Sequence, residues 1–247
     1  MKTINTYITE KLKISKNQNP KYTLFPKDID ELNEMMADEI EKNGWNCSLN
    51  HIDTSKITSM RKLFYNSLFN GDISEWDVSN VTNMAFMFGR SDFNGDISEW
   101  DVSNVTDMDS LFFTSKFNGD ISAWDVSNVT DMGNMFYNSK FTGSISQWNV
   151  SRVKYMQAMF LNSVFNDDIS EWDVSNVTSM TAMFERSEFN RDISKWDVSN
   201  VMHMQYMFKS SKFNQDISNW QISLKCDKTG MYANSHIKAD YKPKIYK

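Results

Sequence analysis

Two series of aspartates recur at 24-residue intervals and present the first candidate chemistry, a calcium site. Calcium prefers clustered oxygen ligands, and stacked carboxylates about 5 Å apart would supply them. The alternative is that each aspartate accepts hydrogen bonds from nearby backbone amides in an Asx turn. Asn149, Gln221 and Ser144 interrupt the two series, which favours the Asx turn. The aspartates are Asp77, Asp101, Asp125, Asp173 and Asp197 in one series, and Asp72, Asp96, Asp120, Asp168, Asp192 and Asp216 in the other.

Histidine and cysteine form no catalytic pattern in this sequence. His51, His203 and His236 stand at different positions relative to the 24-residue interval, so they assemble neither a nucleophile–base pair nor a metal-ligand set. There is no glycine-rich phosphate loop. Cys47 and Cys226 are expected about 34 Å apart, beyond disulfide reach, as reduced thiols or as an intermolecular link. We predict that the protein is not an enzyme and carries no cofactor and no metal.

A 24-residue sequence repeat sets the positions of all these residues. Tryptophan recurs at 76, 100, 124, 148, 172, 196 and 220 without slippage. A repeat this regular predicts a solenoid, because a unit this short must bury its apolar face against its neighbours. The predicted units are 49–72, 73–96, 97–120, 121–144, 145–168, 169–192, 193–216 and 217–240, the last of them degenerate.

Apolar spacing within a unit predicts a short strand followed by a helical return. Ile73, Trp76 and Val78 match the strand spacing of a leucine-rich repeat, and the stretch 81–88 changes to helix-like spacing. The predicted fold class is therefore an LRR-like repeat solenoid of eight units, each with a short parallel β-strand and a short helical or 3₁₀ return. The repeated tryptophans and methionines are predicted to form its core.

An α-helix is predicted before the repeats, at about 28–43. Asp28 is its expected N-cap, Glu31 completes a capping box, and Gly44 suits the C-terminal stop. This helix would cover the open end of the first unit.

The remaining segments are assigned from charge and apolar spacing. Residues 1–24 are predicted to form a basic arm or short helix, and a mobile end without a role is the alternative. The predicted domains are this arm, a helical N-cap at 25–48, the solenoid at 49–240 and a basic tail at 241–247. The apolar residues that share one face of the arm are Ile4, Tyr7, Ile8 and Leu12.

The repeated motif is specific enough to suggest a family. The segment FNGDISEWDVSNVTNMAFMF at 69–88 resembles the BspA-like leucine-rich-repeat family of mycoplasma and other bacterial surface proteins. The resemblance covers 49–240, and it implies an adhesion or protein-binding scaffold without catalytic activity. The opening stretch, MKTINTYITEKLKISK, lacks the apolar run of an export signal. A cytoplasmic location is therefore predicted, with the cell surface as the alternative that the resemblance implies.

Net charge argues against nucleic acid as the partner. The chain carries −6 overall, with +5 in residues 1–27, +4 in 225–247 and −15 in 28–224. An acidic repeat array does not suit a polyanion. No apolar run approaches the roughly 18 residues of a membrane span.

We predict non-catalytic binding of another protein, with the oligomeric state left open. One alternative is a bacterial surface adhesin for a host protein or glycan, and another is a structural or assembly protein that docks through its N-terminal arm. Exposed aromatic residues at variable positions mark the candidate interface, unless they tuck against the neighbouring turn. The predicted partner-binding residues are Tyr65, Phe86, Phe113, Tyr137, Leu161 and Tyr206.

Overall fold

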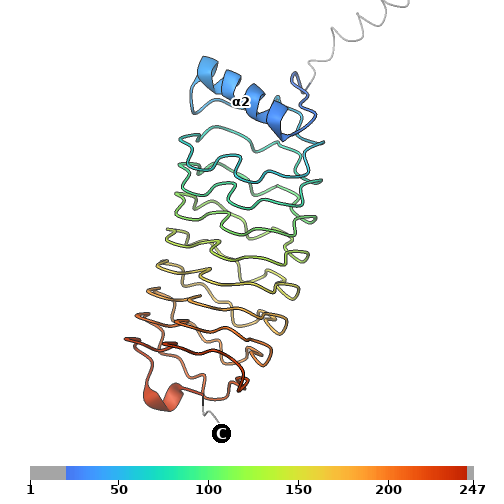
Figure 1. The fold of residues 1–247 in the computed structure, drawn as a ribbon. Helices are drawn as coiled ribbons and strands as arrows, with labels where there is room; N and C mark the ends of the chain where they lie inside the picture. Colours follow the sequence, from blue (N-terminus) through green and yellow to red (C-terminus); the bar gives the residue numbers. More distant parts are fainter. Residues whose placement is uncertain (1–20, 244–247) are drawn as a thin grey trace, which may run out of the picture.

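The computed structural model describes residues 21–243, and residues 1–20 and 244–247 lie outside the described part. The arm predicted at 1–24 falls almost entirely outside it, as does most of the predicted tail. The described chain winds into a column of stacked coils, with one α-helix across its N-terminal end and a 3₁₀ turn near its C-terminal end (Figure 1). Within 21–243 no helix is long and apolar enough to cross a membrane.

Helix α2 spans Ile29–Asn43, where the capping signals predict a helix. The Asp28 carboxylate accepts hydrogen bonds from the amides of Asp30 (3.1 Å) and Glu31 (3.0 Å). The capping box differs from the prediction in one partner. The Glu31 carboxylate accepts from the amide of Lys27, which lies one residue before the N-cap, at 3.0 Å. The start of α2 is thus held by two carboxylates, as the positive end of a helix dipole favours.

The buried face of α2 lies on the first coil. Leu32 and Met36 are almost fully buried, and Gly44 ends the helix with a φ of 85°. Before the helix, Leu24 forms a parallel bridge with Ile52 of the first coil. The N-terminal end of the apolar core is therefore covered by α2.

The coils contain no strands, so the predicted LRR-like solenoid of eight units with β-strands and helical returns is wrong. Between residues 21 and 243 the helical elements are α2 and the 3₁₀ turn η1 (Ala239–Tyr241). Parallel pairing there is limited to isolated bridges, and most of them join residues 24 apart. At the predicted strand 73–78 the chain makes a turn at 74–75, and at the predicted return it makes a run of turns at 85–90.

Positive backbone φ angles explain why the predicted helical returns do not form. Phe86 and Arg90 have φ of 60° and 54°, and residues at the same two positions of the other coils are also positive. Two left-handed residues in each of these segments interrupt the right-handed conformation that an α- or 3₁₀-helix requires. The chain closes short turns instead, such as the bond from the Met87 amide to the Met84 carbonyl (3.0 Å). Because non-glycine residues seldom adopt positive φ, side-chain type did not reveal these turns.

Backbone hydrogen bonds join each coil to the next. Amides at four alternate residues of one coil donate to four alternate carbonyls of the following coil, and we call this arrangement the ladder. The four bonds recur at 24-residue steps as far as Ser210, whose amide donates to Ala233. In the first coil the pairs, 2.8–2.9 Å apart, are Met60–Asn83, Lys62–Ala85, Phe64–Met87 and Asn66–Gly89.

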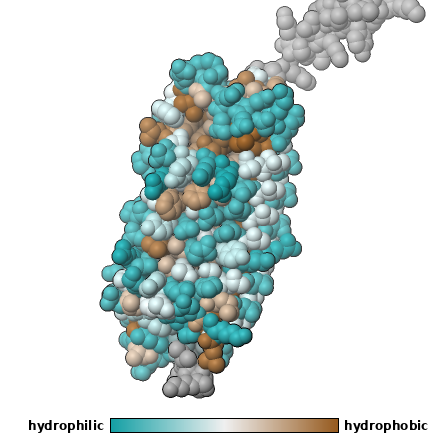
Figure 2. Space-filling model, in the orientation of Figure 1, coloured by the Kyte–Doolittle hydropathy of each residue, from teal (hydrophilic) through white to brown (hydrophobic). Residues whose placement is uncertain are grey.

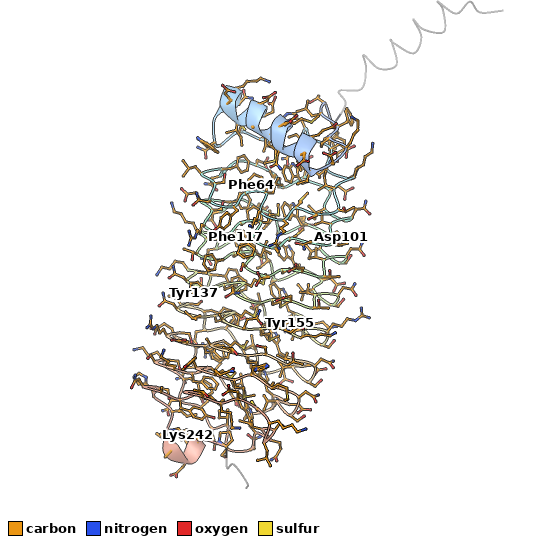
Figure 3. The ribbon with its side chains drawn as sticks, in the orientation of Figure 1. Phe64, Asp101, Phe117, Tyr137, Tyr155 and Lys242 are labelled. Carbon is orange, nitrogen blue, oxygen red and sulfur yellow. The ribbon has the colours of Figure 1, made fainter. Side chains whose placement is uncertain are left out.

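The core is a set of aligned side-chain columns. The predicted tryptophans are only 3–4% exposed, and the predicted methionines at 84, 108, 132, 156, 180 and 204 are fully buried. Each repeat tryptophan donates its indole N–H to a carbonyl 27 residues earlier, as Trp124 does to Ile97 at 3.0 Å. Phenylalanines add two further columns, in which Phe88 stacks on Phe112 with ring centroids 5.8 Å apart. Phe64 and Phe117 of these columns point into the interior (Figure 3).

Candidate functional site

The ladder leaves one side of the column free to carry different side chains in different coils. We call this surface the ladder face, formed by outward side chains of the ladder segments. All four inter-coil bonds of the ladder are made by backbone atoms, so they do not depend on side-chain identity. The segments are 59–66, 83–90, 107–114, 131–138, 155–162, 179–186, 203–210 and 227–234.

The predicted partner-binding residues lie on the ladder face, but they form separate groups. Phe113 and Tyr137 are half-buried neighbours that stack with ring centroids 4.8 Å apart. Tyr65 and Phe86 meet edge to face at 5.9 Å. Leu161 follows Tyr137 at the same position of the next coil and is half-buried.

Tyr206 stands apart from these groups toward the C-terminal end, with 40% of its surface exposed. Its ring lies 4.9 Å from the Lys209 ammonium. The structure therefore brings together two aromatic pairs rather than one continuous row. Each pair rests partly on its neighbours and keeps part of its surface accessible.

Cations flank the aromatic pairs, and the sequence reasoning missed them. The Arg90 guanidinium lies 5.6 Å from the Phe113 ring centroid, and Arg61 lies 5.5 Å from that of Phe86. Lys62 lies 5.6 Å from the same Phe86 ring. Distances of this size permit cation–π attraction. Aligning the coils on their 24-residue repeat would have placed these cations beside the aromatic positions.

Tyr155 is a further exposed aromatic that the sequence reasoning missed. It is 44% exposed and forms a ladder bridge with Asp131 in the preceding coil. Tyr155 and Tyr137 are both labelled in Figure 3, on different parts of the column surface. The position of Tyr155 within the repeat did not predict an exposed aromatic residue, because the equivalent residues of other coils are polar, such as Ser179 and His203.

The repeated aspartates hold Asx turns. The Asp77 carboxylate accepts from the amide of Ser79 at 3.0 Å and from its hydroxyl at 2.6 Å. In the second series Asp120 accepts from the amide of Ser122 at 2.9 Å. These bonds hold the pKa of Asp120 below its ordinary value, and the same cause lowers the pKa of Asp96.

The Asx turns also account for an interruption of the aspartate series. Asn149 takes the place of aspartate, and its amide oxygen accepts from the Ser151 amide at 3.2 Å. A neutral amide oxygen thus performs the same task. In residues 21–243 no group of three or more histidine, cysteine, aspartate or glutamate side chains is arranged to hold a metal ion.

Asp131 on the ladder face behaves differently from the turn aspartates. Its carboxylate accepts from the Gly133 amide at 2.8 Å but is half-buried beside Asp109 and Asp107. Burial raises the pKa of Asp131, and the two neighbouring carboxylates raise it further. The charged form of Asp131 is therefore disfavoured in the folded chain.

Two of the three histidines make their contacts at opposite ends of the column. His51 pairs with Glu39 of α2 at 3.5 Å, while His236 contacts the carbonyl of Ser211 at 2.7 Å near the other end of the column. Both cysteines are free thiols, and burial raises the pKa of each.

An apolar groove lies between α2 and the first coil, and the sequence reasoning did not predict it. We call it the end groove. Its volume is about 590 Å³. In Figure 2 hydrophobic colour gathers beneath the helical end of a mainly hydrophilic surface. Trp45 on its wall is 49% exposed. The apolar residues that line the groove are Met36, Ala37, Ile40, Trp45, Leu63 and Phe64.

Comparison with known proteins places the repeats in a family. A family model described as "Mycoplasma protein of unknown function, DUF285" matches the chain twice, at residues 30–142 and 137–242. The two matches follow one another along the column, as expected for tandem repetition. Neither the curated proteins nor the solved structures include a match. The chain therefore belongs to the DUF285 family.

Proposed function

We propose that this protein is a non-catalytic scaffold that binds another protein through its ladder face. The observation that carries the proposal is the stacked, half-exposed pair Phe113 and Tyr137, which lies where side chains differ from coil to coil. Two further arguments support it: the freedom of this face to vary and the chemistry of its residues.

Side-chain hydrogen bonds restrict variation elsewhere on the column. The Asn104 amide donates to the Ser79 carbonyl of the preceding coil at 2.8 Å, and Asn94 accepts from the Asn118 amide at 2.7 Å. Replacing such a residue leaves a backbone group without its partner. The ladder needs no side chains for its bonds. Recognition residues can therefore change on the ladder face without loss of inter-coil pairing.

Aromatic rings beside cations suit a protein interface. Aromatic residues and arginine are enriched in the energetically dominant parts of protein–protein interfaces. The group formed by Arg90, Phe113 and Tyr137 supplies both. Its rings are already stacked, so less conformational freedom is lost when a partner binds.

The test is affinity capture from the organism that encodes the chain, with two matched variants. We expect the double variant Phe113→Ala/Tyr137→Ala to lose a partner that the wild type captures. The control Glu99→Ala/Lys140→Ala alters exposed residues of the same two coils without changing net charge and should retain the partner. Thermal unfolding of both variants checks that each remains folded. Equal capture by all three proteins would exclude this aromatic pair as the binding site.

Resemblance to BspA-like proteins supports a more specific form of the proposal. In that form the partner of the ladder face is a host protein or glycan, and the chain acts as a surface adhesin. In the alternative form the location is cytoplasmic and the partner of the ladder face is an internal protein. Fractionation of the native cells with an antibody against the column distinguishes the two locations.

A further inference from the structure

We propose that residues 1–16 of this chain dock in the end groove. Their apolar residues would lie against the groove wall formed by α2, Trp45 and the first coil. The docked segment would complete the cover of the N-terminal end that α2 begins. The proposal does not depend on the ladder face. It concerns an apolar surface at the N-terminal end that the described residues leave exposed.

The end groove leaves apolar side chains exposed at the N-terminal end of the column. Trp45 is 49% exposed, and Leu68 beside the groove residue Ser67 is 60% exposed. Ile40 of α2 is only partly buried against the core. Covering such surface is favourable by about 25 cal/mol per Å² of apolar area. A contiguous patch of this kind typically marks a contact surface.

The sequence of residues 1–16 offers a matching apolar surface. Ile4, Tyr7, Ile8 and Leu12 recur at three- and four-residue spacing, so they form one stripe when the segment is helical. An amphipathic helix laid in an apolar groove is a common mode of recognition. We therefore assign residues 1–16 as the occupant of the end groove, because their apolar stripe matches its apolar lining.

Charge favours this segment over the other parts of the chain. Residues 1–20 contain four lysines and one glutamate, whereas α2 contains six acidic residues and one lysine. Glu34, Asp38 and Glu41 of α2 are exposed and make no ion pair with the other described residues. Glu41 is also part of the groove lining. A basic segment beside this acidic helix gains attraction at both ends of the stripe.

The connection is long enough for docking within one chain. The described chain begins at Lys21, and the amides of Thr23 and Leu24 are fixed to the His51 carbonyl at the same end of the column. Helix α2 has 15 residues, which makes it about 22 Å long. Residues 13–20 span up to about 26 Å when extended. The stripe can therefore reach the groove without any movement of α2.

Trp45 provides the measurement. It is about half-exposed, whereas the tryptophans of the repeat are only 3–4% exposed. Acrylamide quenching of the intrinsic fluorescence therefore reports mainly on Trp45. We compare the full-length wild type with Ile8→Asp/Leu12→Asp, which puts two charges into the stripe. The control is Asn5→Asp/Thr9→Asp, which adds the same charges at polar positions.

The expected result is shielding of Trp45 in the wild type and in the control. The Ile8→Asp/Leu12→Asp variant should show a several-fold rise in the quenchable fraction, and this rise should disappear in a Trp45→Phe background. Equal quenching of all three proteins would overturn the proposal. So would a rise that persists without Trp45, because the signal would then come from the core.

Dilution separates docking within the chain from docking between copies. Shielding that is independent of concentration, with a monomeric mass by light scattering, supports the assignment. Shielding that is lost on dilution together with a dimeric mass would assign the groove to the segment of a second copy and would overturn the arrangement proposed.

Discussion

Aspartates in this chain have opposite electrostatic roles that depend on burial. In the Asx turns, backbone amides stabilise the carboxylate and lower the pKa, as at Asp120. Such groups contribute stability above their unfolded pKa, and this contribution is lost as the pH falls through the folded pKa. At Asp131 burial raises the pKa, so the carboxylate costs stability at neutral pH. The cost begins as the pH rises above the unfolded pKa of about 3.9 and is complete above the folded pKa.

Replacing Asp131 with asparagine should stabilise the protein at neutral pH. Asparagine occupies the same position at Asn83, where its oxygen accepts from the Ala85 amide at 2.9 Å, so the local turn is preserved. We expect Asp131→Asn to raise the midpoint of urea unfolding at pH 7 and to leave it unchanged at pH 3. Asp120→Asn should have the opposite sign at pH 7. A lower midpoint for Asp131→Asn at pH 7 would contradict the effect of burial.

The tryptophan columns predict a large difference between Trp124 and Trp45. Trp124 is buried and bonded to the Ile97 carbonyl, so Trp124→Ala should destabilise the protein by about 3–5 kcal/mol. Trp45 is about half-exposed among the described residues, so Trp45→Ala removes mainly its contacts with the docked residues 1–16 and should cost clearly less than Trp124→Ala. Urea titrations followed by circular dichroism measure both. Similar losses for the two variants would place Trp45 in the core.

The two ends of the column carry complementary ladder edges. In the first coil the carbonyls of the ladder, at Ser59, Arg61, Leu63 and Tyr65, accept no hydrogen bond from the described residues. In the last coil the amides at the donor positions, 228, 230, 232 and 234, donate none to them. Between every two neighbouring coils, the amides and carbonyls at these positions bond to each other. Open edges of this kind promote association between chains, and α2 blocks one of them.

Dislodging α2 should therefore produce head-to-tail oligomers. The variant Leu32→Asp/Met36→Asp puts two charges into the buried face of the helix. Lys42→Gln/Asn43→Asp changes the net charge by the same amount at exposed positions outside the end groove and serves as the control. Light scattering should show concentration-dependent growth for the first variant alone, because a heterologous contact does not close. A folded monomer in both cases would show that α2 is not required to block the edge.

The column as a whole is bound together by contacts between adjacent coils. Most bridges and the ring stacks between coils join positions 24 residues apart, and each ladder bond joins residues 23 apart. Stability of such an array is approximately a sum of coil terms and nearest-neighbour terms. Removal of one complete interval should therefore preserve the alignment of every remaining column.

Internal deletions test this dependence on register. Deleting 121–144 removes one interval and should leave a shorter chain with a cooperative unfolding transition. Deleting 121–132 removes half an interval and should place polar turn residues opposite the core columns, which abolishes the transition. Near-ultraviolet circular dichroism of the tryptophans measures both. Equal behaviour of the two deletions would mean that coil register does not hold the column together.

The sequence by itself determined the period, the buried columns and the N-terminal helix. Tryptophan and methionine recur every 24 residues, so identical side chains align in columns when the coils stack. The caps of α2 at Asp28 and Gly44 depend only on residues that are neighbours in the sequence. Local composition also suggested the Asx turns, because an aspartate two residues before a serine can bond within its own segment.

Only the tertiary structure decided the conformation of the coils and the grouping of surface residues. Helix-like spacing at 81–88 could not reveal turns with positive φ at Phe86 and Arg90, since inter-coil bonds hold these residues in a conformation that their side chains do not favour. The stacking of Phe113 on Tyr137, the flanking Arg90 and the end groove depend on which coils and helix surfaces meet. Those contacts arise between segments distant in sequence, and therefore no local pattern specifies them.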